Sequence, residues 1–531
     1  MALDTRSMKY KASLAFILLC SLGAGLLVAV SSVKYGPGMT HDSAAYMYAA
    51  QSLLEGKGFQ YFGYPSPFIQ WPPLYPILLA LGKLTGLDYG AAATLINSLA
   101  LAFTVFLTGR WMLEKFKHSA FAVVGTFLLF VSVPLLQVSK FMWSEAVFTL
   151  LFILFYIEFE CFMRHGRYGS LALAALFSAL ACVDRYAGVT IVAAAALFLL
   201  FTHKSKGRKI VDMAFYGLFS AMPMSIWVLR NYIVSGTLLG VRLPSTYTLK
   251  LNIRRTLESV YSWVQPDKLL AQHAEGILLY SFKAFAVLLP LLIAAAFTAT
   301  VARSLADYST TRKLPAELKQ ETDKFLPVAF FTVFSLIYIV YLIASATSVA
   351  FEPINSRYLI PVFLPFVLTL LIASDYLYGR LVICSGIKLV RFIMYIMLSL
   401  FLIYPAVNTV AFMSDNYHNG AGGIATDAWH DKSGFLQYMK NTGQCTYYSN
   451  SADAVYVLSG IRTYSPPKKK GPYMYGLEQF KTAVSRDENS YIIWFENGVP
   501  STLYNLEEMG KMFALKEVGS FEGGMVYRIL K

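Results

Sequence analysis

The sequence predicts an α-helical protein that crosses a membrane many times and ends in a small water-soluble α/β domain. Of its 531 residues, 56% are hydrophobic and only 14% are charged, and the mean hydropathy of +0.52 lies outside the range of soluble globular chains. Many uninterrupted apolar segments of about 20 residues, enough to span a hydrocarbon core, occur before residue 415. From Ser414 onward, polar residues and short alternating runs replace them. We therefore expect a membrane domain over 1–413 and a soluble domain over 414–531.

About eleven apolar segments are predicted to cross the membrane. They are 12–33, 88–112, 119–139, 143–164, 168–184, 187–204, 209–233, 277–302, 325–347, 358–380 and 387–413. The region 168–202 is interpreted as a hairpin rather than one long span, because Asp184, Arg185 and Gly188 at its midpoint would be costly inside lipid. Two further helices, in "SAAYMYAAQSLLEGKG" and "PPLYPILLALGKLTG", are predicted to lie along the membrane surface within the first outer loop.

The positions of lysine and arginine predict the orientation. The net charge of +14 reflects topology rather than a nucleic-acid partner, because basic residues gather in cytoplasmic loops. Arg6, Lys9 and Lys11 precede the first span, which is longer than the h-region of a cleaved signal peptide. Alternate loops hold Arg110, Lys115 and Lys117; Arg164 and Arg167; Lys204, Lys206, Arg208 and Lys209; Arg303, Arg312, Lys313, Lys319 and Lys324; and Arg380, Lys388 and Arg391. The N-terminus is therefore predicted to be cytoplasmic, and loops 34–87 and 234–276 and the C-terminal domain to be extracytoplasmic, at the plasma membrane.

The C-terminal part alternates strand-like and helix-like segments. "CTYYSN" and "SYIIWFE" indicate strands, and "SADAVYVLSG" and "LEQFKTAV" indicate helices. The stretch "SPPKKKGP" is predicted to be a solvated loop. Only Cys445 of the five cysteines lies in this part, so no disulfide framework is implied.

The first outer loop contains the main candidate for chemistry, Asp42. Aspartate is among the best N-cap residues, so a purely structural role for Asp42 stays open. At the edge of a bilayer, however, partial desolvation raises the proton affinity of a carboxylate, which suits a general base. Glu145 begins the span 143–164, where it either complements the helix dipole or joins the site. Six aromatic residues later in the loop are predicted to form an interfacial belt rather than a sugar-stacking platform: Phe59, Tyr61, Phe62, Tyr64, Phe68 and Trp71.

Several stretches carry a resemblance to a known family. An aspartate followed by small and aromatic residues, then "SLLEGKGF" and "PPLYP", resembles the first outer loop of the GT-C glycosyltransferases. It is most similar to the branch of protein O-mannosyltransferases and lipid A aminoarabinose transferases. Four later stretches agree: "WSEAVFTLLF" with Glu145, "DRYAGV" with Arg185, "IWVLRNYIVSGTLLGVR" with Arg230 and Asn231, and "INSRYLIPVFLP" with Arg357 and Tyr358. The resemblance covers most of the membrane domain and also implies many helices, two surface helices and an outer C-terminal domain.

The resemblance implies an inverting glycosyltransferase that moves a hexosyl or pentosyl group from a polyprenyl-phosphate donor to a hydroxyl of a glycan, glycolipid or protein. It assigns Asp42 as the base, with Glu145 as a second catalytic residue. Arginines grip phosphate oxygens with a planar fork, so Arg185 and Arg357, with Tyr358 and Arg230, are expected to bind the lipid phosphate. Snorkelling, or pairing of the two arginines with Asp184 and Glu352, is the structural alternative.

His41 and Asn231 are further candidate site residues. No cofactor is expected, and a divalent metal is not indicated, because His41 lacks a paired-histidine spacing. Ser43 follows the aspartate where protein O-mannosyltransferases have a glutamate, which argues against a protein acceptor recognised through that pair.

A lipid-linked oligosaccharide ligase or polymerase stays open, although the W-W-D signature of oligosaccharyltransferases is absent. A lipid or solute transporter is less well supported, because the charges lie at outer helix ends rather than in mid-membrane.

Overall fold

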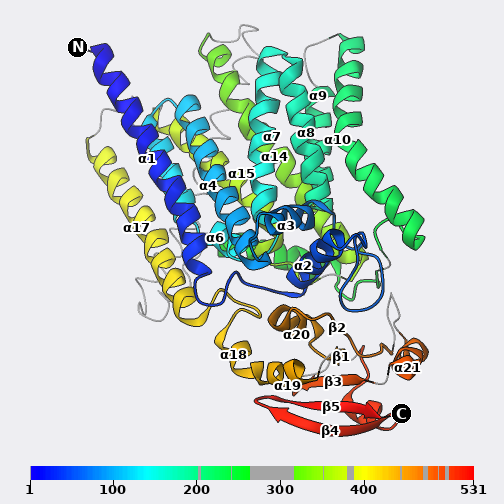
Figure 1. Ribbon diagram of the computed structural model, residues 1–531. Coiled ribbons are helices and arrows are strands. Elements are labelled where there is room, and N and C mark those ends of the chain that lie inside the picture. Colours follow the sequence, from blue (N-terminus) through cyan, green and yellow to red (C-terminus); the bar gives the residue numbers. More distant parts are fainter. Residues whose placement is uncertain are drawn as a thin grey trace.

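A computed structural model describes ten stretches of the chain. These are residues 2–200, 205–240, 242–263, 316–350, 352–379, 388–442, 445–469, 476–487, 489–496 and 502–530. They form a helical bundle and a smaller sheet-containing domain that lies against one end of it (Figure 1). We call this the C-domain end of the bundle. The predicted span 277–302 lies outside the described residues.

The bundle confirms the prediction of a multi-pass α-helical membrane protein. Its helices are α1 (Ala2–Ser31), α4 (Tyr89–Lys115), α5 (Ser119–Phe130), α6 (Val133–Ser139), α7 (Glu145–His165), α8 (Tyr168–Asp184), α9 (Val189–Leu200), α10 (Lys206–Ser235), α14 (Ala316–Ser348), α15 (Ser356–Leu377) and α17 (Lys388–Asn419). Within the described stretches, six helices are long and apolar enough to cross a membrane, or seven spans if the bent pair α5 and α6 counts as one. The total of about eleven spans stays a prediction.

One predicted span is bent, and the predicted hairpin divides into two helices. The span 119–139 is bent by 44° between α5 and α6, where Ser132 caps α6 and accepts a hydrogen bond from the backbone N–H of Leu135. The region 168–202 divides into α8 and α9, which are joined through a 3₁₀ turn, η1 (Tyr186–Gly188). A Cβ atom at Gly188 would collide with the backbone of Ala181, so the chain packs tightly back onto α8, as the predicted hairpin requires.

The two predicted helices of the first loop are present at the C-domain end (Figure 1). They are α2 (His41–Leu54) and α3 (Leu74–Leu84). The N-cap of α2 is Thr40 rather than Asp42, and Ser43 Oγ accepts a hydrogen bond from the backbone N–H of Thr40 at 3.0 Å. The capping role considered for Asp42 is therefore wrong, and its side chain is available for other partners. An amphipathic helix that the sequence did not predict, α11 (Leu249–Ser262), lies between α10 and α14 in the chain.

The C-terminal domain is α/β, as predicted. Its strands are β1 (Thr446–Ser449), β2 (Thr463–Tyr464), β3 (Ser490–Phe495), β4 (Ala514–Phe521) and β5 (Gly524–Leu530), in the order β2-β1-β3-β5-β4. Strands β2, β1 and β3 are parallel, whereas β5 and β4 are antiparallel. The helices of this domain are α18 (Asp427–His430), η3 (Asp431–Gly434), α19 (Phe435–Asn441), α20 (Ala452–Ser459), α21 (Leu477–Arg486) and α22 (Leu506–Gly510). The predicted boundary at 413/414 falls within α17, which continues to Asn419.

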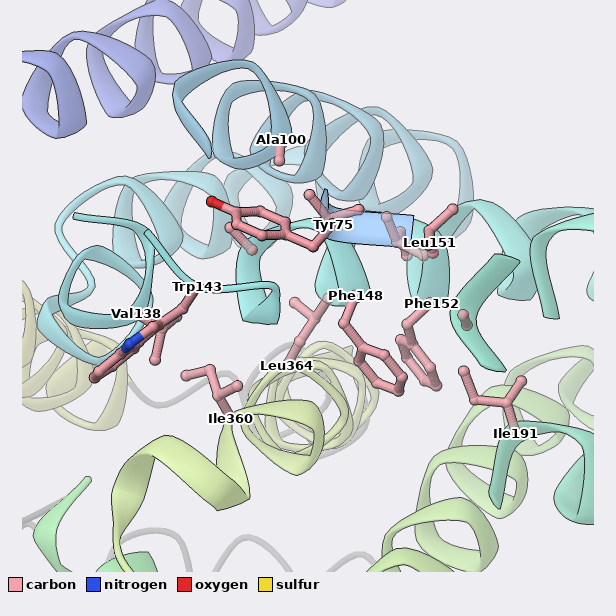
Figure 2. Packing of buried hydrophobic residues seen from close by; sticks show 14 of the residues in the cluster. Tyr75, Ala100, Val138, Trp143, Phe148, Leu151, Phe152, Ile191, Ile360 and Leu364 are labelled. Atoms are coloured by element: carbon pink, nitrogen blue, oxygen red, sulfur yellow. The ribbon is translucent and has the colours of Figure 1, made fainter. Parts of the chain in front are cut away.

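A close-packed apolar core joins α7 to α15. Figure 2 shows Phe148 and Phe152 of α7 and Leu364 of α15 in one apolar cluster, to which Tyr75 of α3 also belongs. These four side chains are almost completely buried. Because interiors pack at crystal-like density, this core fixes how α7 and α15 lie relative to one another. Their first turns therefore keep a constant separation, and each of those turns carries a charged residue.

Candidate active site

Four charged side chains from distant parts of the chain meet at the C-domain end of the bundle. Arg357 donates from Nη2 to Oδ2 of Asp42 and from Nε to Oε1 of Glu145, both at 2.7 Å. Nη1 of Arg185 also lies 2.7 Å from Oε1 of Glu145. The structure thus brings together two carboxylates and two guanidinium groups. We call these four residues the charged cluster.

Each member of the charged cluster is placed by a helix terminus. Glu145 is the first residue of α7, Arg185 caps the C-terminus of α8, and Arg357 is the second residue of α15, whose N-cap Asn355 accepts from the Arg357 N–H. The side chain of Glu145 is completely shielded, whereas those of Asp42, Arg185 and Arg357 are 22%, 16% and 11% exposed. The charged cluster is therefore fully buried at Glu145 and partly exposed to solvent at Asp42.

The backbone at the start of α2 is held from two sides. On one side, Met142 N–H donates to Gly38 O at 2.9 Å, just before α7. On the other side, Ile424 N–H donates to Met39 O at 2.8 Å, from the segment that follows α17. Gly423 has a φ of +62°, and a Cβ atom there would collide with Met39 O, so glycine is required at this close approach. Segments from three regions of the sequence therefore fix the point from which α2 begins.

Trp143 is a further member of the site that the sequence did not single out. The guanidinium carbon of Arg357 lies 3.6 Å from the centroid of the Trp143 ring, which is a close cation–π contact. The indole N–H of Trp143 donates to Thr40 Oγ1 at 2.9 Å, which links the ring to the N-cap of α2. The available signal was its place two residues before Glu145 in the stretch "WSEAVFTLLF".

The other two predicted donor-binding residues, Tyr358 and Arg230, are bonded elsewhere: Tyr358 bonds Glu352, and Arg230 bonds backbone carbonyls. The Tyr358 hydroxyl donates to Glu352 at 2.8 Å, and its ring centroid is 5.6 Å from the Arg357 guanidinium carbon, so Tyr358 borders the charged cluster. Arg230 donates to the carbonyls of Phe68 and Phe59 at 2.8 and 3.1 Å. These contacts anchor the first loop to α10. Asn231 is buried, donates to Leu238 O at 3.2 Å and accepts from Arg230, which makes it part of the same loop anchor.

The pairings considered as structural alternatives are wrong for both Arg185 and Arg357. Arg185 pairs with Glu145 rather than Asp184, whose buried carboxylate oxygens have no hydrogen-bond partner among the described residues. Glu352 bonds Tyr358 rather than Arg357.

His41 connects the first loop to the C-terminal domain. Its Nε2 lies 2.8 Å from the Tyr61 hydroxyl, and its Nδ1 lies 3.5 Å from Oδ2 of Asp453 in α20. Neighbouring protein atoms disfavour the charged imidazole although half of the His41 side chain is exposed, and the nearby carboxylates of Asp453 and Asp42 outweigh this and raise the pKa of His41. Burial also opposes ionisation of Asp453, yet His41 and backbone N–H groups lower the pKa of Asp453 below 3.8. Within the described stretches, no group of three His, Cys, Asp or Glu side chains is arranged to hold a metal.

The aromatic residues of the first loop pack inside the protein. Phe62 and Phe68 are 1% exposed. Phe62 stacks on Tyr456 of α20 with ring centroids 5.8 Å apart, and Arg462 donates to Tyr61 O at 2.8 Å. The predicted interfacial belt is therefore wrong for these residues, because the C-terminal domain covers Phe62 and Tyr61, and Trp71 and Trp227 pack against Phe68.

The stretch predicted as a solvated loop is partly packed. Lys468 Nζ lies 5.0 Å from the centroid of the Tyr64 ring, and Pro466 and Pro467 are buried. The rest of the stretch, 470–472, lies outside the described residues.

The fold is that of the GT-C glycosyltransferases. No protein-family model and no curated protein sequence matches the chain. Among solved structures, the chain is similar to ArnT from Cupriavidus metallidurans in the apo state, with a TM-score of 0.59 and 11% identity over 99% of this chain and 98% of that chain. The same enzyme bound to undecaprenyl phosphate gives a TM-score of 0.60 and 11% identity over 96% of this chain and 97% of that chain. Archaeal oligosaccharyltransferase AglB from Archaeoglobus fulgidus, in complex with an inhibitory peptide and a dolichol-phosphate, gives a TM-score of 0.53 and 12% identity over 98% of this chain and 74% of that chain. At these identities the similarity establishes the fold that the sequence predicted.

The His41–Asp453 pair predicts a pH dependence of stability. A raised His41 pKa contributes stability that is complete below about pH 6.5 and is lost as the pH rises through the pKa of the folded protein. A lowered Asp453 pKa contributes stability above about pH 4 that is lost as the pH falls through its folded value. We expect the melting temperature to fall by about 1–2 °C on the alkaline side of this window, and Asp453→Asn to remove that component. Thermal unfolding of the purified protein from pH 5 to 9 measures it; an identical profile in Asp453→Asn would contradict the assignment.

Proposed function

We propose that this chain is an inverting glycosyltransferase that transfers a sugar from a polyprenyl-phosphate donor to an acceptor hydroxyl on the extracytoplasmic side of the membrane. The charged cluster is the observation that supports this most directly: an accessible carboxylate, Asp42, lies next to two guanidinium groups at the end of a GT-C bundle. Similar solved structures hold undecaprenyl phosphate or a dolichol-phosphate. These are ligands whose phosphate matches the chemistry of arginine.

In the proposed reaction, Asp42 accepts the proton of the acceptor hydroxyl as its oxygen attacks the anomeric carbon. The bond from that carbon to the phosphate oxygen breaks, and its electron pair stays on the lipid phosphate. Arg185 and Arg357 stabilise the charge that develops there, which is the main requirement for a leaving group that needs no protonation. A single displacement without a covalent enzyme intermediate inverts the anomeric centre. The reaction requires no cofactor.

Glu145 has a different role in this proposal from Asp42. It is completely shielded and contacts both arginines through one oxygen, so it orients the two guanidinium groups toward the donor. Because it faces no accessible space, it does not exchange a proton with the acceptor. We assign it as a positioning residue.

Transfer of a preassembled oligosaccharide is the second candidate function. The similarity in fold to AglB, an oligosaccharyltransferase, favours it. Mass spectrometry of cell-surface glycans from cells lacking the protein separates the two candidates: loss of one sugar unit supports the first, and loss of a whole chain supports the second.

Replacing Asp42 by Asn tests the assignment of the base. The substitution keeps the shape of the side chain but removes the proton acceptor, so we expect sugar transfer to fall by about 10²–10⁴-fold. Glu55→Gln removes an exposed carboxylate from the C-terminal end of the same helix and should keep full activity. Membrane yield and thermal unfolding report whether each variant is folded. Full activity in a folded Asp42→Asn protein would remove Asp42 from the mechanism.

Replacing Arg357 by Lys tests the donor phosphate site. Lysine keeps the charge but not the fork, so the apparent affinity for the lipid donor should fall by about 10- to 100-fold, while the KM for the acceptor changes little. Arg230→Lys is the matched control, because Arg230 binds loop carbonyls rather than the charged cluster. A change confined to the acceptor KM would show that Arg357 does not bind the donor.

Cysteine labelling tests the proposed orientation. Lys481 is exposed on α21 of the C-terminal domain, and Arg110 is exposed near the opposite end of the bundle. A membrane-impermeant maleimide should label Lys481→Cys in intact cells and Arg110→Cys only after lysis, each compared with the parent chain. The reverse pattern would invert the orientation.

A further inference from the structure

Arg357 is shared between the proposed base and the proposed phosphate site. Its Nη2 and Nε each hold a carboxylate oxygen, one from Asp42 and one from Glu145. An acceptor hydroxyl needs a carboxylate oxygen of Asp42, and a donor phosphate needs N–H groups of Arg357. In the structure, Oδ2 of Asp42 accepts from Nη2 of Arg357, so one oxygen of the proposed base and one nitrogen of the proposed phosphate site are engaged with each other.

The two carboxylates on Arg357 are not equivalent. Glu145 is completely shielded and bonds two arginines; removing a partner from a buried charge is costly. Asp42 is the more exposed carboxylate, and among the described residues Arg357 is its one ion-pair partner. An exposed pair contributes less than a buried one. A competing anion would therefore displace Asp42 from Arg357 and leave Glu145 in place.

We propose that the donor phosphate exchanges with Asp42 on Arg357, so that donor binding itself releases the base. The inference rests on the proposed function and adds the way in which its site is regulated. Before the donor binds, Arg357 holds Asp42 through Oδ2, and the carboxylate is engaged with the guanidinium rather than with the acceptor. Once the phosphate takes over the N–H groups of Arg357, Asp42 is free to accept a proton.

The charges balance through the whole cycle. Two carboxylates and two guanidinium groups sum to zero, and a donor phosphodiester adds one negative charge. During transfer, the acceptor proton neutralises Asp42, while the departing lipid phosphate gains one negative charge. The total stays at minus one, but the charge has moved from Asp42 to the phosphate. Arg357 already holds the phosphate at this stage, so it lies where the charge accumulates, and a guanidinium binds a more highly charged partner more strongly.

Lipid phosphate binding tests the exchange without requiring catalysis. The affinity of undecaprenyl phosphate for the full-length protein in nanodiscs is measured for the parent, Asp42→Asn, Arg357→Ala and the double variant. Because Asp42→Asn removes the competitor, it should bind about tenfold more tightly than the parent. Arg357→Ala should bind more weakly, and adding Asp42→Asn to it should give no gain. Glu55→Gln, which removes a carboxylate from the same helix, should match the parent. Asp42→Ser must reproduce the gain, so the test does not depend on one substitution folding.

The outcomes separate the exchange from the proposed function. If Asp42→Asn and Asp42→Ser bind undecaprenyl phosphate no more tightly than the parent, or if the gain survives in Arg357→Ala, the exchange is wrong and the donor site stands. If the parent does not bind the lipid phosphate and Arg357→Ala makes no difference, the proposed function is wrong, and the exchange with it.

Discussion

The candidate site depends on one buried carboxylate, Glu145. An ionised glutamate with no solvent contact is tolerated only if cationic donors surround it, because desolvating a charge costs several kcal/mol. Here Arg185 and Arg357 both reach the same oxygen of Glu145. This requirement fixes the ends of α8 and α15 against the start of α7. Asp42 is then drawn in from α2 by the remaining edge of Arg357.

The C-terminal domain takes part in placing Asp42, the proposed base. Ile424, which follows α17, bonds the backbone directly before α2, and Asp453 and Tyr456 of α20 contact His41 and Gln51 of α2. The proposed base is therefore carried by a helix that is held between the membrane bundle and the C-terminal domain. A movement of the C-terminal domain would change the position of Asp42 relative to Arg357, so this domain is coupled to the proposed chemistry.

The sequence predicted the helices well and the roles of individual polar residues less well. Apolar runs reveal spans such as α4 and α7 because lipid demands them, and charged residues at span ends gave Asp42, Glu145, Arg185 and Arg357. The sequence did not reveal that Arg230 binds loop carbonyls, because an arginine at a helix end has the same local sequence pattern whichever neighbours it contacts. A capping role for Asp42 could not be decided from the sequence, because Thr40 two residues earlier is also a favoured N-cap, and it is the N-cap of α2. Burial of Phe62 depended on α20, almost 400 residues away, and local pattern contains no such information.

Arg357 shows why this position requires an arginine rather than any cation. It donates to two carboxylates from separate nitrogens while its flat face lies on the Trp143 ring. An ammonium group is a point charge without a planar face, so a lysine would not make these three contacts in a fixed geometry. The indole face lies against the guanidinium group. In the proposed exchange, an anion that arrives at the accessible side meets donors already oriented and displaces only the Asp42 contact.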